Sequence, residues 1–518
     1  MEGNSHRLPI RSLGAADWPD TNRAEEADLM GHGCTWRRWL LMPMTAFAVG
    51  APGAAAQETV DLTGRWSGML TAGAQQIEIV YNLQVGVDDA LIGTMDVPAQ
   101  GATGIPLTTV DFDGRTLSLT FPVPGGGSYE GALSEDGGTI TGTFTQAGQN
   151  IPMDLSRGEP APPPARPQEP RRPFPYEAID VSFANEHAGV TLAGTLTIPH
   201  GSGPFPAAVL VSGSGPQDRD ESLLGHKPFL VLADHLTRNG IAVLRYDDRG
   251  VGASTGDFSA ATSADFADDA LAAIRYLMED NRVAPDAIGI VGHSEGGLVG
   301  PLAASRSEAV DYVVMLAGPG VTGLEVLVEQ GRLINEAAGV PPEISEFNAT
   351  LQTRLAAIAF DTPDQHEAAE RMNAAIDELA ASTSPLVQEA LAAQLSEESK
   401  RRTIEQMNST WFRYFMTYDP RPALERTNVP VLALFGAKDL QVPPEQSSEE
   451  VRAALVRGGN HDATVRVIPG LNHLFQQAGT GSPTEYQSIE ETFNVEALSV
   501  VSEWITRRFG VLPTAVNH

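Results

Sequence analysis

Two patterns of apolar and polar positions divide the chain. From about residue 60 to residue 155, apolar residues alternate with polar ones over short runs such as Leu117-Ser118-Leu119-Thr120-Phe121, with Asp113-Gly114 and Asp136-Gly137 between runs. Alternation with period two, punctuated by such dipeptides, is typical of antiparallel hairpins. We therefore predict a small antiparallel β domain over residues 57–158.

One short pattern occurs twice in that segment. Gly93-Thr94-Met95 is followed by Ile105-Pro106-Leu107, and Gly142-Thr143-Phe144 is followed by Ile151-Pro152-Met153. The repeat predicts duplicated hairpins. Because the segment contains no histidine and no cysteine, catalysis is not expected there. Substrate docking, surface attachment, dimerisation and a purely stabilising role all stay open.

The pattern changes after a proline-rich stretch, residues 159–175, which predicts a semi-rigid extended spacer and a domain boundary. Beyond it, continuous apolar runs alternate with helical patterns over residues 176–518. Strands are predicted at 179–183, 190–198, 206–211, 241–244, 288–291, 312–316, 429–435 and 464–468, and helices at 227–238, 265–278 and 495–509. This alternation predicts an α/β fold with a mostly parallel, eight-stranded sheet covered on both faces.

The segment at about residues 320–426 breaks the alternation, because its pattern is helical throughout. Leu351, Leu355 and Ile358 fall on one helical face, and the stretch Trp411 to Phe415 adds aromatic bulk. Inserted between two predicted strands, the segment is interpreted as a helical lid whose apolar face lines an acyl pocket. The alternative is a packing appendage that touches no substrate.

The first 56 residues are interpreted as a signal-peptide region. Within residues 36–56, Arg37-Arg38 precedes a short apolar run that ends at Ala54-Ala55-Ala56, as in a cleavable signal peptide. We therefore expect export to the periplasm or the medium. Met30 is a better initiator, so residues 1–29 are interpreted as an over-extended start. Because no other stretch of about 20 apolar residues follows, stable membrane insertion is not expected.

Composition narrows the function classes. The formal net charge is -32, which disfavours nucleic-acid binding because such an excess repels phosphate backbones. The single cysteine, Cys34, precedes the apolar run, so the mature chain has none. This excludes a disulfide framework, a thiolate nucleophile and cysteine metal sites. We predict no cofactor and no metal, and the oligomeric state stays open.

The strongest chemical motif is Gly292-His293-Ser294-Glu295-Gly296. It follows the β-branched run Ile288–Val291 and precedes a helix-like stretch, Leu298–Ala304. In this strand–turn–helix context Gly-x-Ser-x-Gly predicts a nucleophile elbow, in which the positions two residues either side of the serine must lack bulk. Ser294 is therefore the predicted nucleophile.

A serine nucleophile needs a base, and the base needs a group that orients it. Asp439 directly follows the predicted strand 429–435, and His473 follows the next one, 464–468. The chain order Ser, Asp, His is the one expected of this fold. Asp419, Glu425 and His461 precede those strands and so lie at the wrong end. The alternatives are that Asp439 only caps a turn and that His473 is a loop histidine whose hydrogen bonds serve the structure alone.

The tetrahedral intermediate needs two N–H donors for its oxyanion. Glu295 supplies one from the start of its helix. The other is expected from the loop Ser212-Gly213-Ser214-Gly215-Pro216, where we choose the Ser214 N–H, with Gly213 and Gly215 as alternatives. Arg249 either binds a substrate carboxylate or, as we favour, belongs to an internal Asp–Arg network.

Residues 176–518 resemble an α/β-hydrolase, most closely bacterial secreted esterases with a dienelactone-hydrolase-like or serine-aminopeptidase-like core. The resemblance rests on segments 212–220, 245–250, 292–297, 436–439 and 472–473. It implies a metal-independent carboxylic-ester hydrolase with the triad Ser294, Asp439 and His473. The oxyanion loop lacks the His-Gly-Gly pattern of the lipase branch, which argues against long-chain lipase activity.

The predicted function is hydrolysis of a small-molecule ester, with short acyl chains, through an acyl-enzyme. A peptidase or amidase on the same triad is the alternative within enzymes, because ester and amide hydrolysis share these parts. A thioesterase or acyltransferase is disfavoured, because an exported enzyme rarely meets coenzyme A esters. A non-catalytic binding module on the same fold is the alternative from another class.

Overall fold

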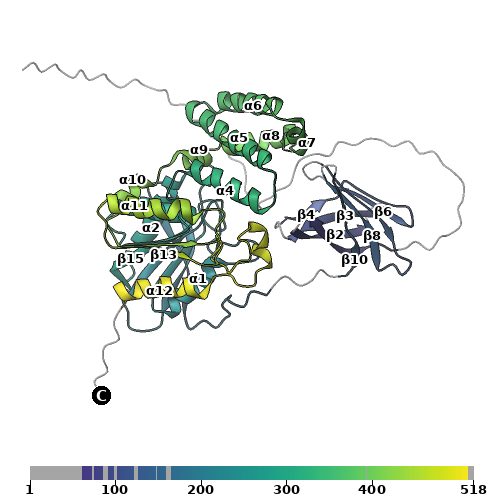
Figure 1. The fold of residues 1–518 in the computed structure, drawn as a ribbon. Coiled ribbons are helices and arrows are strands. Elements are labelled where there is room, and N and C mark those ends of the chain that lie inside the picture. Colours follow the sequence, from purple (N-terminus) through teal and green to yellow (C-terminus); the bar gives the residue numbers. More distant parts are fainter. Residues whose placement is uncertain are drawn as a thin grey trace, which may run out of the picture. The chain divides into compact units, whose positions relative to one another are not determined.

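The computed structural model describes residues 61–72, 75–85, 91–98, 102–121, 126–146, 149–158, 165–391 and 394–510. The predicted signal-peptide region, residues 1–56, lies outside the described residues. The described elements fall into an N-terminal β segment and a larger α/β segment, and each is described by itself (Figure 1).

The β segment is one antiparallel sheet, with strand order β4-β3-β2-β1-β10-β8-β7-β6-β5 and β9 paired to β8. Its strands are β1 (Gly64–Ala72), β2 (Gln75–Val85), β3 (Leu91–Val97), β4 (Ala102–Pro106), β5 (Thr109–Phe112), β6 (Thr116–Phe121), β7 (Gly127–Leu133), β8 (Thr139–Gln146), β9 (Gln149–Pro152) and β10 (Leu155–Arg157). Alternate positions such as Trp66, Tyr81, Leu117 and Leu119 form one buried core. This is the antiparallel β architecture that the alternation predicts.

The predicted duplication of hairpins is present. In the pair β3–β4, Thr94 lies opposite Pro106, and in the pair β8–β9, Thr143 lies opposite Pro152. The residue after each proline donates its N–H to the glycine of the repeat, Leu107 to Gly93 and Met153 to Gly142, both at 2.9 Å. The repeated sequence therefore specifies the same register twice.

The α/β segment contains an eight-stranded sheet of order β11-β12-β14-β13-β15-β16-β17-β18. Its strands are β11 (Tyr176–Asn185), β12 (Val190–Pro199), β13 (Phe205–Val211), β14 (Ala242–Tyr246), β15 (Val283–His293), β16 (Tyr312–Leu316), β17 (Val431–Gly436) and β18 (Ala463–Ile468). The pairs β11–β12 and β12–β14 are antiparallel, and the pairs from β14 to β18 are parallel. The predicted sheet is confirmed.

Helices cover both faces of this sheet, because its central strands are apolar on both sides. The covering helices are α1 (Pro228–Arg238), α2 (Ser263–Met278), α3 (Glu295–Ala304), α10 (Arg421–Arg426), α11 (Pro444–Arg457) and α12 (Val495–Phe509). One core joins the sheet to α2, α3, α10 and α11, and the other joins it to α1 and α12 (Figure 1). The sequence patterns did not single out α11, whose apolar positions are sparse among serines and glutamates.

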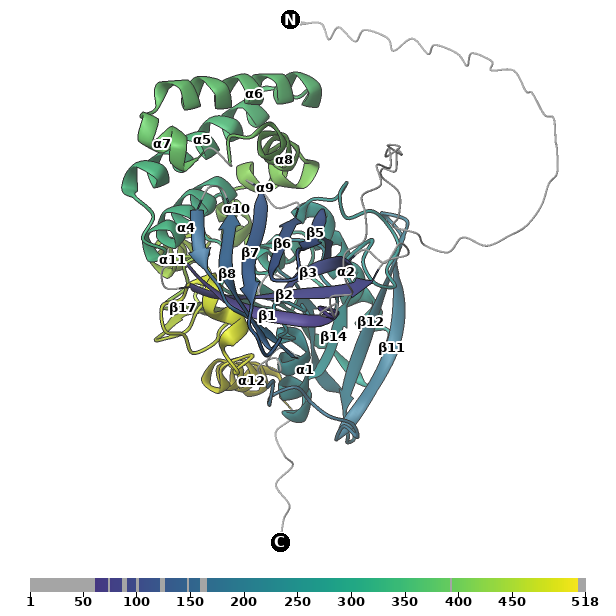
Figure 2. The ribbon, with the colours of Figure 1, turned by 90° about the vertical axis from the view of Figure 1, so that its right-hand side faces the viewer.

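The predicted helical insertion lies between β16 and β17. Its helices are α4 (Gly323–Ala337), α5 (Pro342–Asp361), α6 (Gln365–Ser382), α7 (Pro385–Ala390), α8 (Glu397–Met407) and α9 (Thr410–Thr417). Residues of α5, α6, α8 and α9, including Leu355, Met372, Ile404 and Phe412, form a core of their own. Figure 2 shows α5, α6, α7 and α8 gathered beyond α4 and α9. We call α4 to α9 the helical insertion.

The described end of the proline-rich stretch is bound to the α/β segment. The Arg166 guanidinium donates to the carbonyls of Gln487 at 2.7 Å and Ile489 at 2.8 Å. The Gln168 side chain accepts the Thr492 N–H at 2.6 Å and donates to the Phe493 carbonyl at 2.6 Å. A spacer was predicted over 159–175, but residues 165–175 include this anchor, and residues 159–164 lie outside the described residues.

Candidate active site

The sheet order reverses at β13, which lies between β14 on one side and β15 on the other. In parallel α/β sheets the loops after the carboxyl ends of neighbouring strands meet at such a switch point and form the binding crevice. The loop 212–217 follows β13, and Ser294 follows β15. Asp439 and His473 follow β17 and β18 at the same edge. All the predicted site residues therefore lie at one end of the sheet.

Ser294 has a strained backbone, with φ 53° and ψ -116°. A non-glycine residue in this region persists only where its surroundings enforce it. The two glycines that flank the serine leave no room for a side chain. A Cβ on Gly292 would lie 1.9 Å from the Gly296 carbonyl oxygen, and a Cβ on Gly296 would lie 2.0 Å from the Val211 carbonyl oxygen. The strand, turn and helix thus have the geometry expected of a nucleophile elbow.

Asp439 and His473 are hydrogen-bonded, with 2.8 Å between Asp439 Oδ2 and His473 Nδ1. The Asp439 side chain is fully buried, and that of His473 is 6% exposed. The other oxygen, Asp439 Oδ1, accepts the N–H groups of Gln441 at 2.8 Å and Val442 at 2.9 Å. The carboxylate is thereby fixed at both oxygens and can hold the imidazole in one orientation and tautomer.

His473 lies against the elbow. Its backbone carbonyl is 3.0 Å from Nε2 of His293, the residue before Ser294, and the two imidazole rings have centroids 4.8 Å apart. The Ser294 N–H donates to the Leu316 carbonyl at 2.8 Å. The structure therefore places the hydrogen-bonded Asp439–His473 pair against His293, the residue that directly precedes Ser294.

The two predicted oxyanion donors differ in their surroundings from Gly213, one of the two alternatives. The Gly213 N–H donates to Glu221 Oε1 at 2.8 Å, so it is already used. Among the described residues, the structure gives no acceptor to the Ser214 N–H or to the N–H of Glu295, the first residue of α3. A Cβ on Gly213 would lie 3.2 Å from the Ser294 Cβ, which places the loop directly beside the elbow.

Three carboxylates hold the oxyanion loop. Asp248 accepts the Ser212 hydroxyl at 3.1 Å and the Gln217 N–H at 2.9 Å, while Glu221 accepts the Gly213 N–H. Removal from water raises the pKa of Asp248 to about 8, against the opposing effect of those two hydrogen bonds and with help from Glu295 and Glu221. The loop is thus held on one side by Asp248, which follows β14, and on the other by Glu221.

Glu295 is the third carboxylate, and it also contacts the helical insertion. Its side chain accepts the Ser263 hydroxyl at 2.5 Å, and its two oxygens lie 2.9 and 3.1 Å from the Trp411 indole Nε1. Burial raises the pKa of Glu295, and the hydrogen bonds from Ser263, Trp411 and Ser214 oppose that rise. Trp411 on α9 therefore ties the insertion to the elbow.

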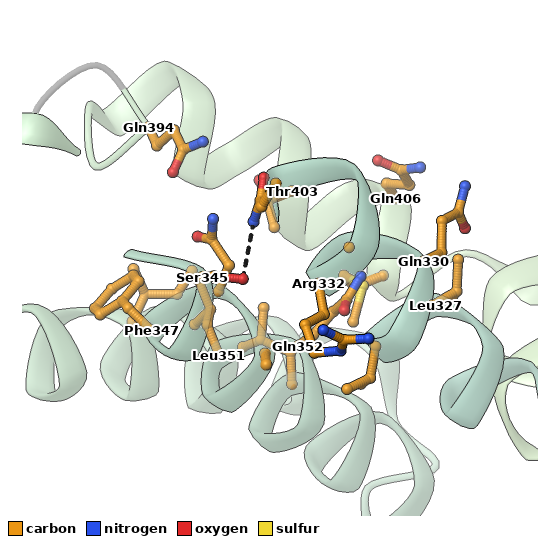
Figure 3. A pocket seen from close by; sticks show the side chains of 18 of the residues that line it. Leu327, Gln330, Arg332, Ser345, Phe347, Leu351, Gln352, Gln394, Thr403 and Gln406 are labelled. Atoms are coloured by element: carbon orange, nitrogen blue, oxygen red, sulfur yellow. Dashed lines mark hydrogen bonds between the residues drawn. The ribbon is translucent and has the colours of Figure 1, made fainter. Parts of the chain in front are cut away.

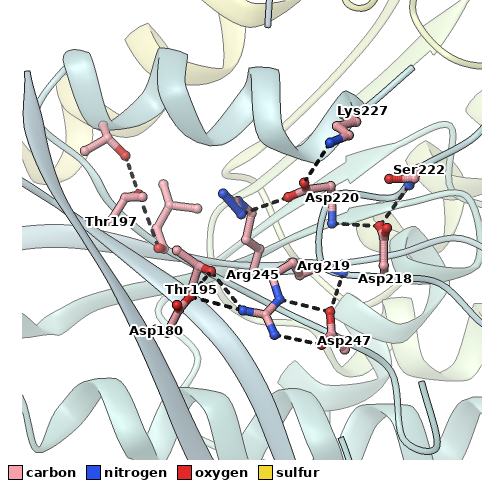
Figure 4. Close-up of polar contacts among 12 residues, drawn as sticks. Asp180, Thr195, Thr197, Asp218, Arg219, Asp220, Ser222, Lys227, Arg245 and Asp247 are labelled. Carbon is pink, nitrogen blue, oxygen red and sulfur yellow. Dashed lines mark hydrogen bonds and ion pairs between the residues drawn. The ribbon is translucent and has the colours of Figure 1, made fainter. Parts of the chain in front are cut away.

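Arg249 does not face this site as a free cation. It is buried, with its Nε 2.8 Å from Asp269 Oδ2, so the predicted internal network is confirmed for it. A second network lies beside β12 and β14 (Figure 4): Arg219 pairs with Asp247 through two of its nitrogens, and Arg245 pairs with Asp220 at 2.9 Å. These pairs fix the loop 218–222.

The helical insertion contains a cavity of about 600 Å³ between α4, α5 and α8 (Figure 3). Its wall combines apolar side chains such as Leu327, Phe347 and Leu351 with amides such as Gln330 and Gln352. None of the triad residues lines it. The Gln330 amide lies 3.4 Å from Gln441, which follows Asp439 by two residues, so the cavity wall contacts the loop of the predicted acid.

No group of three or more histidine, cysteine, aspartate or glutamate side chains is placed to hold a metal ion among the residues that the structure describes. In the same described ranges, no helix is long and apolar enough to cross a membrane.

The sheet order and the elbow define residues 176–509 as an α/β-hydrolase fold. Residues 227–477 match the family model described as serine aminopeptidase, S33. The chain is 28% identical over 317 residues to Esterase EstD of Thermotoga maritima, a match that covers 61% of this chain and 66% of EstD, just under two thirds of its length. These matches confirm the resemblance to serine-aminopeptidase-like hydrolases and esterases that was stated from the motifs.

Solved structures with weaker likeness include the esterase Pf2001 of Pyrococcus furiosus, 16% identical with a TM-score of 0.40 over 68% of this chain and 100% of that one. Another is the α/β hydrolase GrgF from Penicillium sp. sh18, 16% identical with a TM-score of 0.39 over 65% and 100%.

Sequence reasoning missed Glu221, Asp248 and Trp411 as parts of this site. Glu221 directly follows the motif at 212–220, but nothing in the pattern shows that a carboxylate in a charged loop is buried. Trp411 was interpreted only as apolar bulk of the insertion.

Proposed function

We propose that the chain is a serine carboxylesterase that hydrolyses small esters with short acyl chains. The observation that carries the proposal is the buried Asp439–His473 pair beside the strained Ser294 elbow. The similarity to Esterase EstD supports the ester-hydrolase class.

The mechanism follows from the roles of these groups. Ser294 Oγ attacks the ester carbonyl carbon while His473 Nε2 accepts the hydroxyl proton, and Asp439 stabilises the resulting imidazolium. The N–H groups of Ser214 and Glu295 donate to the oxyanion. The alcohol leaves with the proton from His473, and an acyl-Ser294 ester remains. Water then attacks it by the same steps, which releases the carboxylic acid and restores the hydroxyl.

The test is the hydrolysis of p-nitrophenyl acetate, butyrate and decanoate by the wild type and by Ser294→Ala. The proposal predicts turnover that falls with chain length and that drops by at least about 10³-fold in the variant. The exposed Ser259→Ala is the matched control and should retain wild-type rates. Near-wild-type turnover by Ser294→Ala would reject the proposed nucleophile.

A peptidase or amidase on the same triad is a second candidate, because the matching family model is described as a serine aminopeptidase. Recognition of a peptide amino terminus needs an acidic subsite. Comparing turnover of an alanine amide with that of an acetyl ester separates the two.

Export is also proposed, on the sequence of residues 36–56 alone. Cleavage after the Ala54-Ala55-Ala56 stretch is expected on expression in a bacterial host. Mass spectrometry of the purified protein from the periplasmic fraction would give the mature amino terminus. Recovery of the intact chain from the cytosol alone would contradict export.

A further inference from the structure

The residue before the nucleophile, His293, is 6% exposed and has an acceptor at each ring nitrogen. Nδ1 lies 2.9 Å from Glu221 Oε1, and Nε2 lies 3.0 Å from the His473 backbone carbonyl oxygen. A carbonyl oxygen cannot donate, so Nε2 must carry a hydrogen. A neutral imidazole has a single N–H, which leaves Nδ1 without one unless the ring is protonated.

The Glu221 oxygen is itself used as an acceptor. Its Oε1 accepts the Gly213 N–H at 2.8 Å as well as facing His293 Nδ1. A carboxylate with two N–H donors at one oxygen, opposite an imidazolium with two acceptors, satisfies all three contacts. The geometry accommodates this charged pair; a neutral pair would need a hydrogen on Glu221 Oε1 that is donated to His293 Nδ1.

Other groups around His293 agree with a positive ring. The pKa of His293 is raised: burial opposes protonation, but the Glu221 charge, its hydrogen bond, the His473 carbonyl and the charge of Asp439 outweigh it. The His473 and Phe475 rings lie beside it, with centroids 4.8 and 6.5 Å from that of the His293 ring.

Glu221 is held where it is by its own loop. Its backbone has φ 52°, a strained conformation for glutamate. Its N–H donates to the Asp218 carbonyl at 2.9 Å, and the two residues before it are fixed by the pairs Arg219–Asp247 and Asp220–Arg245 (Figure 4). The neighbouring ion pairs thus enforce the position of the Glu221 carboxylate.

We propose that Glu221 and His293 form a buried ion pair that positions the oxyanion loop, the nucleophile and the base relative to one another. Glu221 accepts the Gly213 N–H of the oxyanion loop. His293 directly precedes Ser294 in the chain and donates to the His473 carbonyl. It touches no reacting atom, so both are positioning residues. The inference rests on the proposed serine hydrolase function and adds a requirement to it.

The informative variant is Glu221→Gln, which keeps an acceptor oxygen but removes the charge. His293 then becomes neutral and has one N–H for two acceptors, so one of the two contacts is lost. Because displacements of about 1 Å in an active site can cost about 10²-fold in rate, we expect kcat to fall about 10- to 100-fold. KM should stay within about twofold, because the substrate does not contact the pair.

Two measurements decide the matter. The first is ¹⁵N NMR of labelled wild type at pH 7, with the ring nitrogens of His293 assigned through its own backbone resonances. The proposal predicts that both ring nitrogens of His293 carry hydrogen in the wild type and that one does in Glu221→Gln. The wild-type spectrum tests the ion pair even where a variant fails to fold.

The second measurement is steady-state kinetics of Glu221→Gln beside Asp234→Asn, which removes the charge of a partly buried carboxylate that pairs with Arg238 on α1. The control variant should keep the wild-type kcat even if it loses as much stability as Glu221→Gln does. A wild-type His293 with one protonated nitrogen, or a Glu221→Gln kcat within twofold of wild type, would overturn the inference. Ester turnover that survives Ser294→Ala would instead overturn the proposed function.

Discussion

Replacing Asp248 with asparagine is expected to stabilise the protein progressively as the pH rises. The Asp248 carboxyl accepts the Ser212 hydroxyl and the Gln217 N–H, and its pKa is raised to about 8 in the folded protein from 3.8. An asparagine amide can keep both contacts, because its oxygen accepts the N–H and its NH₂ group can donate to the hydroxyl.

The sign follows from the raised pKa. The folded protein binds a proton at Asp248 that the unfolded chain has released, so this group contributes stability below about pH 4 that is lost as the pH rises to about 8. Each pH unit in that window costs about 1.4 kcal/mol. Between pH 5 and pH 8 the loss is about 2 to 4 kcal/mol, the lower value allowing for solvent at this partly buried side chain.

The assay is urea unfolding of the wild type and Asp248→Asn at pH 5, 6, 7 and 8. The free energy of unfolding of the variant should gain on the wild type by about 2 to 4 kcal/mol across this range and then level off above about pH 9. The exposed Glu186→Gln is the control and should show no such trend. A difference between variant and wild type that is constant with pH would refute the reasoning.

Three further substitutions test separate contacts. Asp439→Asn should lower kcat by about 10⁴-fold, because the imidazole loses its orienting acceptor; a loss below tenfold in ester turnover would contradict this. Trp411→Phe should lower the free energy of unfolding in urea by about 1.5 to 3 kcal/mol, because it removes the donor to Glu295. If the double variant with Glu295→Gln loses the full sum of the two single losses, the two residues are not coupled, which would contradict this prediction. Gly292→Ala should cost more than about 4 kcal/mol by its clash at 1.9 Å, whereas Gly331→Ala, with open space at its Cβ, should be neutral or slightly stabilising; equal melting temperatures would contradict the steric argument.

The fold of the α/β segment was predictable because its information is local. Continuous apolar runs such as 312–316 are buried on both faces of a parallel sheet. Such a run can be identified as a strand from its own residues, without knowledge of the strands that pair with it. The same holds for Gly292 and Gly296, whose spacing around Ser294 is a steric requirement of the turn. The repeat at Gly93 and Gly142 predicted duplicated hairpins, and the structure shows that the two share one register.

The missed features depend on contacts between segments far apart in the chain. Glu221 and His293 are separated by 72 residues, and Trp411 reaches Glu295 across 116. A charged loop residue is normally solvated, so its burial follows only from the ion pairs that fix the loop around it. The anchoring of Arg166 on carbonyls near residue 489 is likewise invisible in a proline-rich pattern.

The central claim is that Ser294 forms an acyl-enzyme, and trapping of that intermediate tests it most directly. Mature protein would be mixed with p-nitrophenyl butyrate, quenched in acid within milliseconds, and mapped by peptide mass spectrometry. The account predicts a butyryl group on the peptide that contains Ser294, absent from Ser294→Ala, together with accumulation of that species in His473→Ala if any acylation persists. Ester hydrolysis with no acyl group on Ser294, or with the acyl group on another residue, would contradict it.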